Sequence, residues 1–272
     1  MDQATASIIN ENGYHYPIDI MTDEEVVKVR ASFDALVSYL GDEPNPFHFK
    51  QLHLFHKWAY DVVTDPRILD VVESLLGPNI LVHSSSIFCK YPNNESFIPW
   101  HQDGVYWGLN KPKLWSVWFA ISDSNIQSGC MRVVPKTHTR KFSHFEQAND
   151  KVMLSSGLTI STDFEEGDVV NLELKPGQIS LHHLNIAHSS ESNKSRQPRI
   201  GFAIRYISTD VKQKMPHFDA LLARGVDDYG HYSLLSEPPG NDLKKALQNQ
   251  MESRIQYDKK RNAYLQSQDV LS

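Results

Sequence analysis

Five short segments between residues 79 and 208 are rich in β-branched and aromatic residues, and no helical pattern separates them. They read "NILVHSSSIFCKYP", "KLWSVWFAISD", "CMRVVP", "DVVNLELKPGQISLHHL" and "RIGFAIRYIS", punctuated by glycine, proline, asparagine and aspartate. Runs of this composition are typical of strands. Because parallel strands need long crossovers, strands in direct succession favour an antiparallel sandwich or barrel. The sequence therefore predicts a mainly β core over about residues 79–210.

Two segments before this core have the pattern of helices. In "MTDEEVVKVRASFDALVSYL", Thr22 and Glu25 stand at capping-box spacing, and apolar residues follow at helical intervals. In "TDPRILDVVESLLGPN", Asp65 can cap the helix, Pro66 suits its first position, and Gly77 ends it. Between these two segments, an amphipathic helical turn is expected near Trp58.

The tail "NDLKKALQNQMESRIQYDKKRNAYLQS" has the charge pattern of an amphipathic helix. We find no internal repeat, low-complexity segment or linker. We therefore expect a single domain over residues 1–272, with a helical N-terminal part over about 1–78, the β core over about 79–210, and a helical tail over about 240–268.

The composition excludes several classes of protein. The formal net charge is −6, which gives no global basic field for nucleic acid. No run of 18 apolar residues is present, and the N-terminus lacks the pattern of a signal peptide. The two cysteines, Cys89 and Cys130, fit a reducing cytoplasm, although a single disulfide remains an alternative. The expected partner is a small molecule, and the oligomeric state is not readable from the sequence.

The stretch "IPWHQDGVYWGL" contains the first candidate metal ligands. On an extended segment residues i and i+2 point to the same side, so His101 and Asp103 can converge on one ion. Taken alone, the pair also fits a surface or structural role.

The stretch "HHLNIAHSSESNKSRQPRIGFAIRY" supplies a third candidate ligand, His188, and Arg199 follows it by eleven residues. If the chain folds back between them, both side chains face one cavity. Two histidines and one carboxylate form the facial triad of non-haem Fe(II) oxygenases. Three open metal positions can accept O2 and 2-oxoglutarate, and arginine suits the far carboxylate of 2-oxoglutarate. His182 and His183 compete as the third ligand, but neither has an arginine at this spacing.

Together, "WHQDGVYWGL", "VWFAISDSNIQSGCMRVVPKTH", "LKPGQISLHH" and "HSSESNKSRQPRIGFAIRY" resemble the phytanoyl-CoA dioxygenase (PhyH-like) family of Fe(II)/2-oxoglutarate-dependent oxygenases. The resemblance covers about half the chain, from the Asp65 helix to Tyr206. It implies a double-stranded β-helix (a cupin-like jelly roll) with flanking helices. The implied site residues are His101, Asp103 and His188 as iron ligands, Arg199 on the distal carboxylate of 2-oxoglutarate, and Ser190 hydrogen-bonded beside it.

The family often has an aromatic residue that lines the cofactor pocket at the position of Trp118, although a plain core tryptophan fits equally. Lys90 could approach 2-oxoglutarate or an acid group of the substrate, or it could be a solvated residue at a strand end. The further candidates, all for the substrate, are Tyr106, Trp107, His53, His56 and Arg205. On a strand Arg199, Gly201, Ala203 and Arg205 would share one side. His53 and His56 would offer positive charge to an anionic substrate.

The resemblance implies a 2-oxoglutarate-dependent dioxygenase (hydroxylase) that uses Fe(II), 2-oxoglutarate and O2. It would hydroxylate an aliphatic C–H of a small polar metabolite and release succinate and CO2. Candidate substrates are an aminophosphonate such as 2-aminoethylphosphonate, a betaine or an amino-acid derivative. The alternatives are a non-catalytic jelly-roll binding or sensing module and a 2-oxoglutarate-independent cupin-type metalloenzyme.

Overall fold

The computed structural model describes residues 3–41, 44–93, 95–146, 151–154, 158–161, 164–214, 219–240 and 242–269. Two antiparallel sheets form its centre. The large sheet has the strand order β1-β9-β4-β11-β2-β12-β13, and the small sheet has the order β3-β10-β5-β8. Two facing sheets of this kind are the architecture of a jelly roll, which confirms the predicted fold class.

The strands of the large sheet are β1 (Tyr14–Asp19), β9 (Gln178–His183), β4 (Leu114–Ala120), β11 (Arg199–Ser208), β2 (Ile80–Lys90), β12 (Asp219–Arg224) and β13 (Ser233–Leu234). Those of the small sheet are β3 (Ile98–His101), β10 (His188–Ser190), β5 (Met131–Val133) and β8 (Val170–Leu172). A separate pair is formed by β6 (His144–Glu146) and β7 (Leu158–Ile160). Among the named strands of the described chain only the β12–β13 pair is parallel, and an isolated parallel bridge joins Phe97 and Val152.

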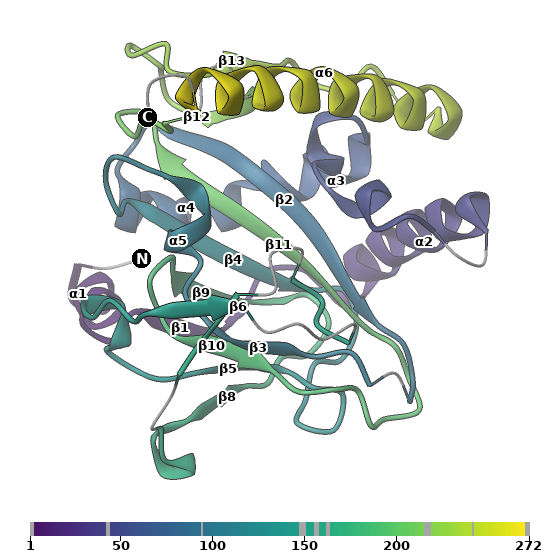
Figure 1. The fold of residues 1–272 in the computed structure, drawn as a ribbon. Helices are drawn as coiled ribbons and strands as arrows, with labels where there is room; N and C mark the ends of the chain where they lie inside the picture. Colours follow the sequence, from purple (N-terminus) through teal and green to yellow (C-terminus); the bar gives the residue numbers. More distant parts are fainter. Residues whose placement is uncertain are drawn as a thin grey trace.

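The helices are α1 (Gln3–Asn12), α2 (Asp23–Leu40), α3 (Lys57–Val63), α4 (Pro66–Leu76), α5 (Gly104–Trp107) and α6 (Leu243–Asp269). Short 3-10 turns cover Pro46–Phe49, Leu52–Leu54, Thr137–Thr139 and Glu166–Asp168. In Figure 1, α6 lies along one end of the molecule, next to β12, and the small sheet lies toward the opposite end. None of the described helices is both long and apolar enough to span a membrane.

The helix boundaries follow the sequence signals. Thr22 and Glu25 form the predicted capping box at the start of α2. The Asp65 side chain accepts a hydrogen bond from the Arg67 backbone, Pro66 is the first residue of α4, and Gly77 follows its end with φ of 86°. A positive φ is the conformation that glycine adopts at little cost.

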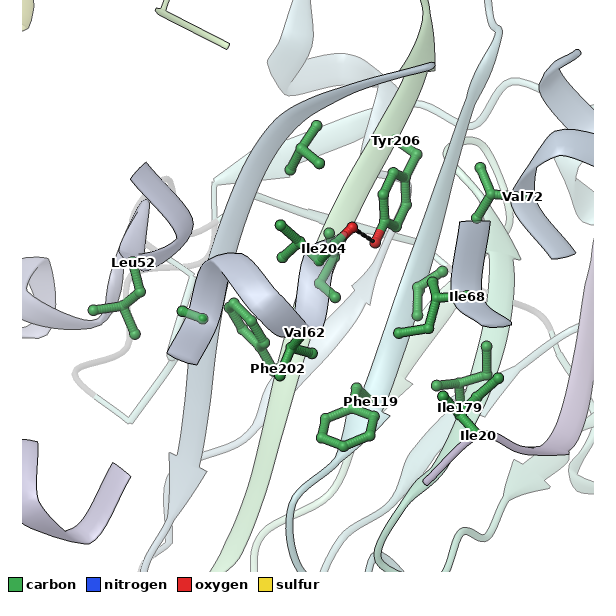
Figure 2. Close-up of a cluster of buried hydrophobic side chains, with 14 of the residues drawn as sticks. Ile20, Leu52, Val62, Ile68, Val72, Phe119, Ile179, Phe202, Ile204 and Tyr206 are labelled. Atoms are coloured by element: carbon green, nitrogen blue, oxygen red, sulfur yellow. Dashed lines mark hydrogen bonds between the residues drawn. The ribbon is translucent and has the colours of Figure 1, made fainter. Parts of the chain in front are cut away.

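The main core lies between the helices and the outer face of the large sheet. Val62, Ile68 and Val72 from α3 and α4 pack against strand residues such as Phe119 and Phe202 (Figure 2). The hydroxyl of Tyr206 donates to the carbonyl of Val63 over 2.8 Å, which ties β11 to the end of α3. The other face of the large sheet meets the small sheet in a second cluster that contains Trp118, Met131 and Ala203. The large sheet is therefore buried on both faces.

The chain departs from the sequence-based boundaries at both ends of the core. Residues Tyr14–Asp19, in the part expected to be helical, form β1 at the edge of the large sheet. A short run that contains a proline carries a weak strand signal, and only pairing with β9 makes it a strand. Beyond residue 210, β12 extends the same sheet along β2. Cys89 and Cys130 are free thiols, so the structure forms no disulfide between them.

Candidate metal and co-substrate site

Strand register brings the two candidate histidine ligands together. His188 on β10 is the direct partner of His101 on β3, and their ring centroids lie 4.0 Å apart. The Asp103 carboxylate completes the group, with Oδ1 3.4 Å from Nε2 of His101 and 4.0 Å from Nε2 of His188. All three side chains are buried, and their ligand atoms lie within 4.8 Å of one another. One cation can therefore contact all three.

Asp103 reaches this position by a different route from the one expected. Strand β3 ends at His101, and Asp103 has helical angles (φ −62°, ψ −30°) at the start of α5. The two side chains converge because the chain turns there, not because it stays extended. Gly104 permits the turn, since a Cβ at that position would meet Oδ1 of Asn185 at 2.0 Å.

Gln102, between the two ligands, holds this turn in place and was not singled out from the sequence. Its side-chain amide donates to the carbonyl of Arg140 over 2.7 Å and also contacts the carbonyl of Asn185. It is 3% exposed. A glutamine between two polar residues looks like a solvated residue in the sequence, so no local signal identifies it.

The protonation of the triad suits a divalent cation. Nδ1 of His101 donates to the carbonyl of Pro99 over 2.9 Å, and Nδ1 of His188 donates to that of Ile186 over 3.0 Å. In each ring Nε2 then faces the cluster with its lone pair, which is how bound histidines are oriented. Burial lowers the pKa of His188 well below its usual value, so the ring is neutral.

The Asp103 carboxylate is ionised. Burial favours its neutral form, but the contact with His101 and the charge of Arg205 hold the pKa of the carboxyl below its usual range. Two imidazoles and one carboxylate are a donor set suited to Fe(II).

Arg199 is the first residue of β11 and is 1% exposed. Its Nη1 donates to the carbonyl of Gly129 and, over 3.3 Å, to the hydroxyl of Ser190. Its Nε and Nη2 find no hydrogen-bond partner among the residues that the structure describes. A buried guanidinium with two unused nitrogens fits the planar carboxylate of 2-oxoglutarate.

The connection between His188 and Arg199 is not a hairpin. β10 lies in the small sheet and β11 in the large one, so the loop between them crosses from one sheet to the other. Both residues therefore border the space between the sheets, as expected, but from opposite walls.

Lys90 joins Arg199 and is not a solvated lysine. It is the direct partner of Arg199 across β2 and β11, and it is 0% exposed. Its ammonium group donates to the carbonyl of Ser190 over 3.0 Å and contacts the Ser190 hydroxyl and the Glu191 carbonyl. Burial and the charge of Arg199 lower the pKa of Lys90 to about 6.

Trp118 forms a wall beside Arg199. The guanidinium carbon lies 4.8 Å from the centroid of the indole ring. The ring fits there because residue 201 is glycine: a Cβ on Gly201 would meet Cζ2 of Trp118 at 1.9 Å. The indole N–H of Trp118 has no hydrogen-bond partner within the described chain.

Arg205 and Trp107 lie together near the triad. The Arg205 guanidinium is 5.8 Å from the Trp107 ring centroid, and its charge acts on Asp103. The residue is 9% exposed, so it is not a surface arginine. The backbone of Tyr106 belongs to α5, but its side chain lies outside what the structure describes.

His53 and His56 do not supply the positive charge expected of them. Nδ1 of His53 is 2.7 Å from the hydroxyl of Ser85, which faces the helices because its β11 partner Ile204 belongs to the main core. Burial lowers the pKa of His53 to about 3 and that of His56 to about 4, so both are uncharged. They are structural residues of the helical layer.

The chain is similar to known oxygenases over most of its length. The family model of phytanoyl-CoA dioxygenase (PhyH) matches residues 9–201. The dioxygenase lolE1 of Epichloe uncinata is 23% identical over 193 residues, which cover 71% of this chain and 67% of that protein. The probable alpha-ketoglutarate-dependent hypophosphite dioxygenase of Stutzerimonas stutzeri is 23% identical over 222 residues, covering 80% and 71%.

A solved structure extends the similarity to almost the whole chain. The apo form of the non-heme monooxygenase ThoJ is 31% identical, with a TM-score of 0.82 over 98% of this chain and 100% of that one. The similarity spans the helices as well as both sheets. The chain therefore belongs to the phytanoyl-CoA dioxygenase family of Fe(II)- and 2-oxoglutarate-dependent oxygenases.

Proposed function

We propose that this protein hydroxylates an aliphatic C–H of a small polar metabolite, with Fe(II), 2-oxoglutarate and O2. In this proposal His101, Asp103 and His188 bind the iron. Arg199, Lys90 and Ser190 bind the far carboxylate of 2-oxoglutarate, and Trp118 lines its pocket. Bound iron and 2-oxoglutarate supply the oxidising chemistry, with succinate and CO2 as the products of the co-substrate.

The observation that carries the proposal is the pair of buried cations, Lys90 and Arg199, on one side of a buried two-histidine, one-carboxylate cluster. Without an anion, the two basic groups cannot both carry a charge at little cost in an apolar interior, and the pKa of Lys90 is accordingly lowered to about 6. The carboxylate of 2-oxoglutarate would relieve this repulsion and would use the free nitrogens of Arg199.

The protein's own residues prepare the site before any ligand arrives. Backbone carbonyls fix the two histidine rings, and Gln102 fixes the turn that carries Asp103. Trp118 and Gly201 bring an apolar ring face next to Arg199, which keeps water away from the bound carboxylate and strengthens its pairing.

A small polar substrate is supported by polar side chains on the inner wall, where Ser116 and Ser180 are buried with hydroxyls that lack a partner in the described chain. The name of the Stutzerimonas stutzeri relative gives hypophosphite, a small oxyanion, as the substrate of that protein. We propose an amino-acid derivative, a betaine or an aminophosphonate such as 2-aminoethylphosphonate.

The free thiols of Cys89 and Cys130 support a reducing, cytoplasmic location.

The test is anaerobic addition of Fe(II) and then 2-oxoglutarate to the metal-free protein, with the visible absorption recorded. We expect the charge-transfer band of a chelated Fe(II)–2-oxoglutarate complex. The band should be weaker at equal 2-oxoglutarate concentration in Arg199→Ala and absent in His188→Ala. Absence of the band in folded, iron-loaded protein would favour the non-catalytic module, and activity that survives in Arg199→Ala would favour the 2-oxoglutarate-independent metalloenzyme.

A further inference from the structure

Four strands of the large sheet place polar side chains at one level of its inner face. The register pairs His182 on β9 with Ser116 on β4, Ser116 with Arg205 on β11, and Arg205 with Ser84 on β2. Directly paired residues of antiparallel strands point to the same face of a sheet. These four side chains therefore form one line across the wall of the interior, here named the polar row (His182, Ser116, Arg205 and Ser84).

Each member of the polar row is buried, with an exposed fraction between 0% for Ser116 and 9% for Arg205. Each also has a polar atom without a hydrogen-bond partner in the described part of the chain: Nδ1 of His182, Oγ of Ser116, Nε of Arg205 and Oγ of Ser84. Buried polar atoms in folded proteins are nearly always hydrogen-bonded. Four such atoms in one line indicate that their partners belong to a bound molecule.

The polar row lies beside the metal triad. The ring centroid of His182 is 4.9 Å from that of His188, and Arg205 is close enough to Asp103 for each to affect the pKa of the other. A molecule bound along the row would therefore reach the triad. This is the position that a substrate of the proposed reaction must occupy.

Arg205 gives the row its charge preference. Its guanidinium carbon lies 5.9 Å from the ring centroid of Phe88 and 5.8 Å from that of Trp107. Its Nη1 donates to the carbonyl of Ala203 on its own strand over 3.3 Å, and among the described residues it forms no ion pair. Asp103 acts on Arg205 through its charge but forms no ion pair with it, so the buried guanidinium and its unpartnered Nε can still bind an anionic ligand.

Arg205 and Arg199 serve different anionic groups. They are six residues apart on the same face of β11, which corresponds to about 20 Å along a strand. Lys90 and Ser190 accompany Arg199, whereas the hydroxyls of Ser84 and Ser116 accompany Arg205. The inner wall thus offers one anion site at each end.

We infer that the polar row is the substrate subsite, and that the substrate carries an oxyanion, a carboxylate or a phosphonate, which Arg205 binds beside the metal triad. The hydroxyls of Ser84 and Ser116 hydrogen-bond to the same molecule. The aromatic rings of Trp107 and Phe88 hold the guanidinium in place. This inference rests on the proposed function, because the molecule in question is the substrate of the proposed hydroxylation.

The test uses binding to the full-length protein loaded with Ni(II), which does not turn over, and saturated with 2-oxoglutarate. Small amino acids, betaines and aminophosphonates, 2-aminoethylphosphonate included, are titrated by calorimetry. Each is measured beside its uncharged partner, defined as the derivative whose acid group is blocked as an amide or full ester and therefore carries no negative charge. We expect at least one acid to bind, and its uncharged partner to bind at least about 30-fold more weakly. The carboxylate and phosphonate members of the panel show which oxyanion is preferred.

Variants of the polar row assign the preference to Arg205. Arg205→Gln should weaken binding of the acid by at least about 30-fold and leave that of the uncharged partner nearly unchanged, with 2-oxoglutarate affinity retained. Ser116→Ala, which alters no charge and is expected to fold, should weaken the acid by about fivefold. Arg261→Gln, at an exposed position of α6, removes one positive charge as the matched control and should bind like the wild type.

Three outcomes would overturn the inference: no acid of the panel binds, the uncharged partners bind as well as the acids, or Arg205→Gln keeps the preference for the acid. Failure of the proposed function looks different. In that case 2-oxoglutarate itself does not bind to the Ni(II)-loaded wild type, and acid binding that depends on Arg205 would still support the subsite.

Discussion

Lys90 and Arg199 are direct cross-strand neighbours on β2 and β11, and both cationic side chains are buried with the hydroxyl of Ser190 between them. In the ligand-free protein the two like charges oppose each other. Burial and, second, the charge of Arg199 lower the pKa of Lys90 to about 6, so above this pH the ligand-free protein releases the proton of Lys90. The protonation of Lys90 should therefore depend on whether an anion is bound beside Arg199.

Binding of 2-oxoglutarate should take up a proton. At pH 8 Lys90 is mostly uncharged in the ligand-free protein, and a carboxylate next to it raises its pKa. Calorimetry in buffers with different ionisation enthalpies should give an uptake of about one proton per 2-oxoglutarate bound. Lys90→Met should bind 2-oxoglutarate with no uptake at this pH, and an equal uptake in both proteins would contradict the role of Lys90.

The stability of the ligand-free protein should rise with pH between about 6 and 10.5 through Lys90. In this window the unfolded chain binds a proton at Lys90 and the folded protein does not, so unfolding takes up the proton and an increase in pH favours the fold. The contribution to the slope is at most about 1.4 kcal/mol per pH unit. Urea unfolding at several pH values should show a flatter profile for Lys90→Met, with the variant more stable than the wild type at pH 7.

Gly201→Ala should disturb the wall beside Arg199. The new methyl group would collide with the Trp118 ring, and overpacking of this kind costs about 1–3 kcal/mol of unfolding free energy. We also expect weaker 2-oxoglutarate binding, because the ring must move away from Arg199. Gly167→Ala, where no atom lies within 4 Å of the added Cβ, is the matched control and should change neither quantity appreciably. Similar stability of the two variants in urea unfolding would argue against this packing.

Loss of His188 should lower the metal affinity of the protein, whereas substitution of His183 on β9 should not. His188→Ala removes one of three proposed ligands and should lower Ni(II) affinity by at least about 100-fold in equilibrium dialysis. His183→Gln should stay within a few-fold of the wild type, because its Nε2 donates to the carbonyl of Pro112 and its Nδ1 accepts from the backbone of Asn185. The reverse pattern would place the metal site elsewhere.

Acid should destabilise the protein through its buried histidines. The folded-state pKa values of His53 and His56, about 3 and 4, lie below their usual value of 6.5. The unfolded chain therefore binds protons first as the pH falls below 6.5, and stability is lost progressively down to about pH 4 through His56 and about pH 3 through His53. Unfolding free energies of His53→Gln should fall less steeply over this range, and an unchanged slope would show that His53 does not contribute.

The sequence determined much of the site because its signals are local. The capping box at Thr22, the proline at the start of α4 and the strand runs were all predicted correctly. The alternation that places Arg199 and Arg205 on one face also holds, since it depends only on the geometry of one strand. The structure brings His101, Asp103 and His188 together, although their role in metal binding remains a prediction.

Sequence reasoning was wrong where the answer depends on burial or on the face of the sheet that a side chain occupies. For Lys90 the sequence also allowed a solvated position at a strand end, yet the residue is fully buried beside Arg199. His53 seemed available to a substrate, but it lies on the helical side of β2. A shift of one residue in the register moves a side chain to the opposite face of the sheet, because adjacent residues of a strand point to opposite faces.

The sequence by itself determined which side chains could bind a metal and a carboxylate, and on which strands they lie. Tertiary structure alone decided that His182, Ser116, Arg205 and Ser84 form one row, because pairing between β9, β4, β11 and β2 joins segments distant in the chain. It also decided which charges are buried, since burial depends on the packing of two sheets and a helical layer. Both properties arise from long-range contacts, which no local sequence pattern encodes.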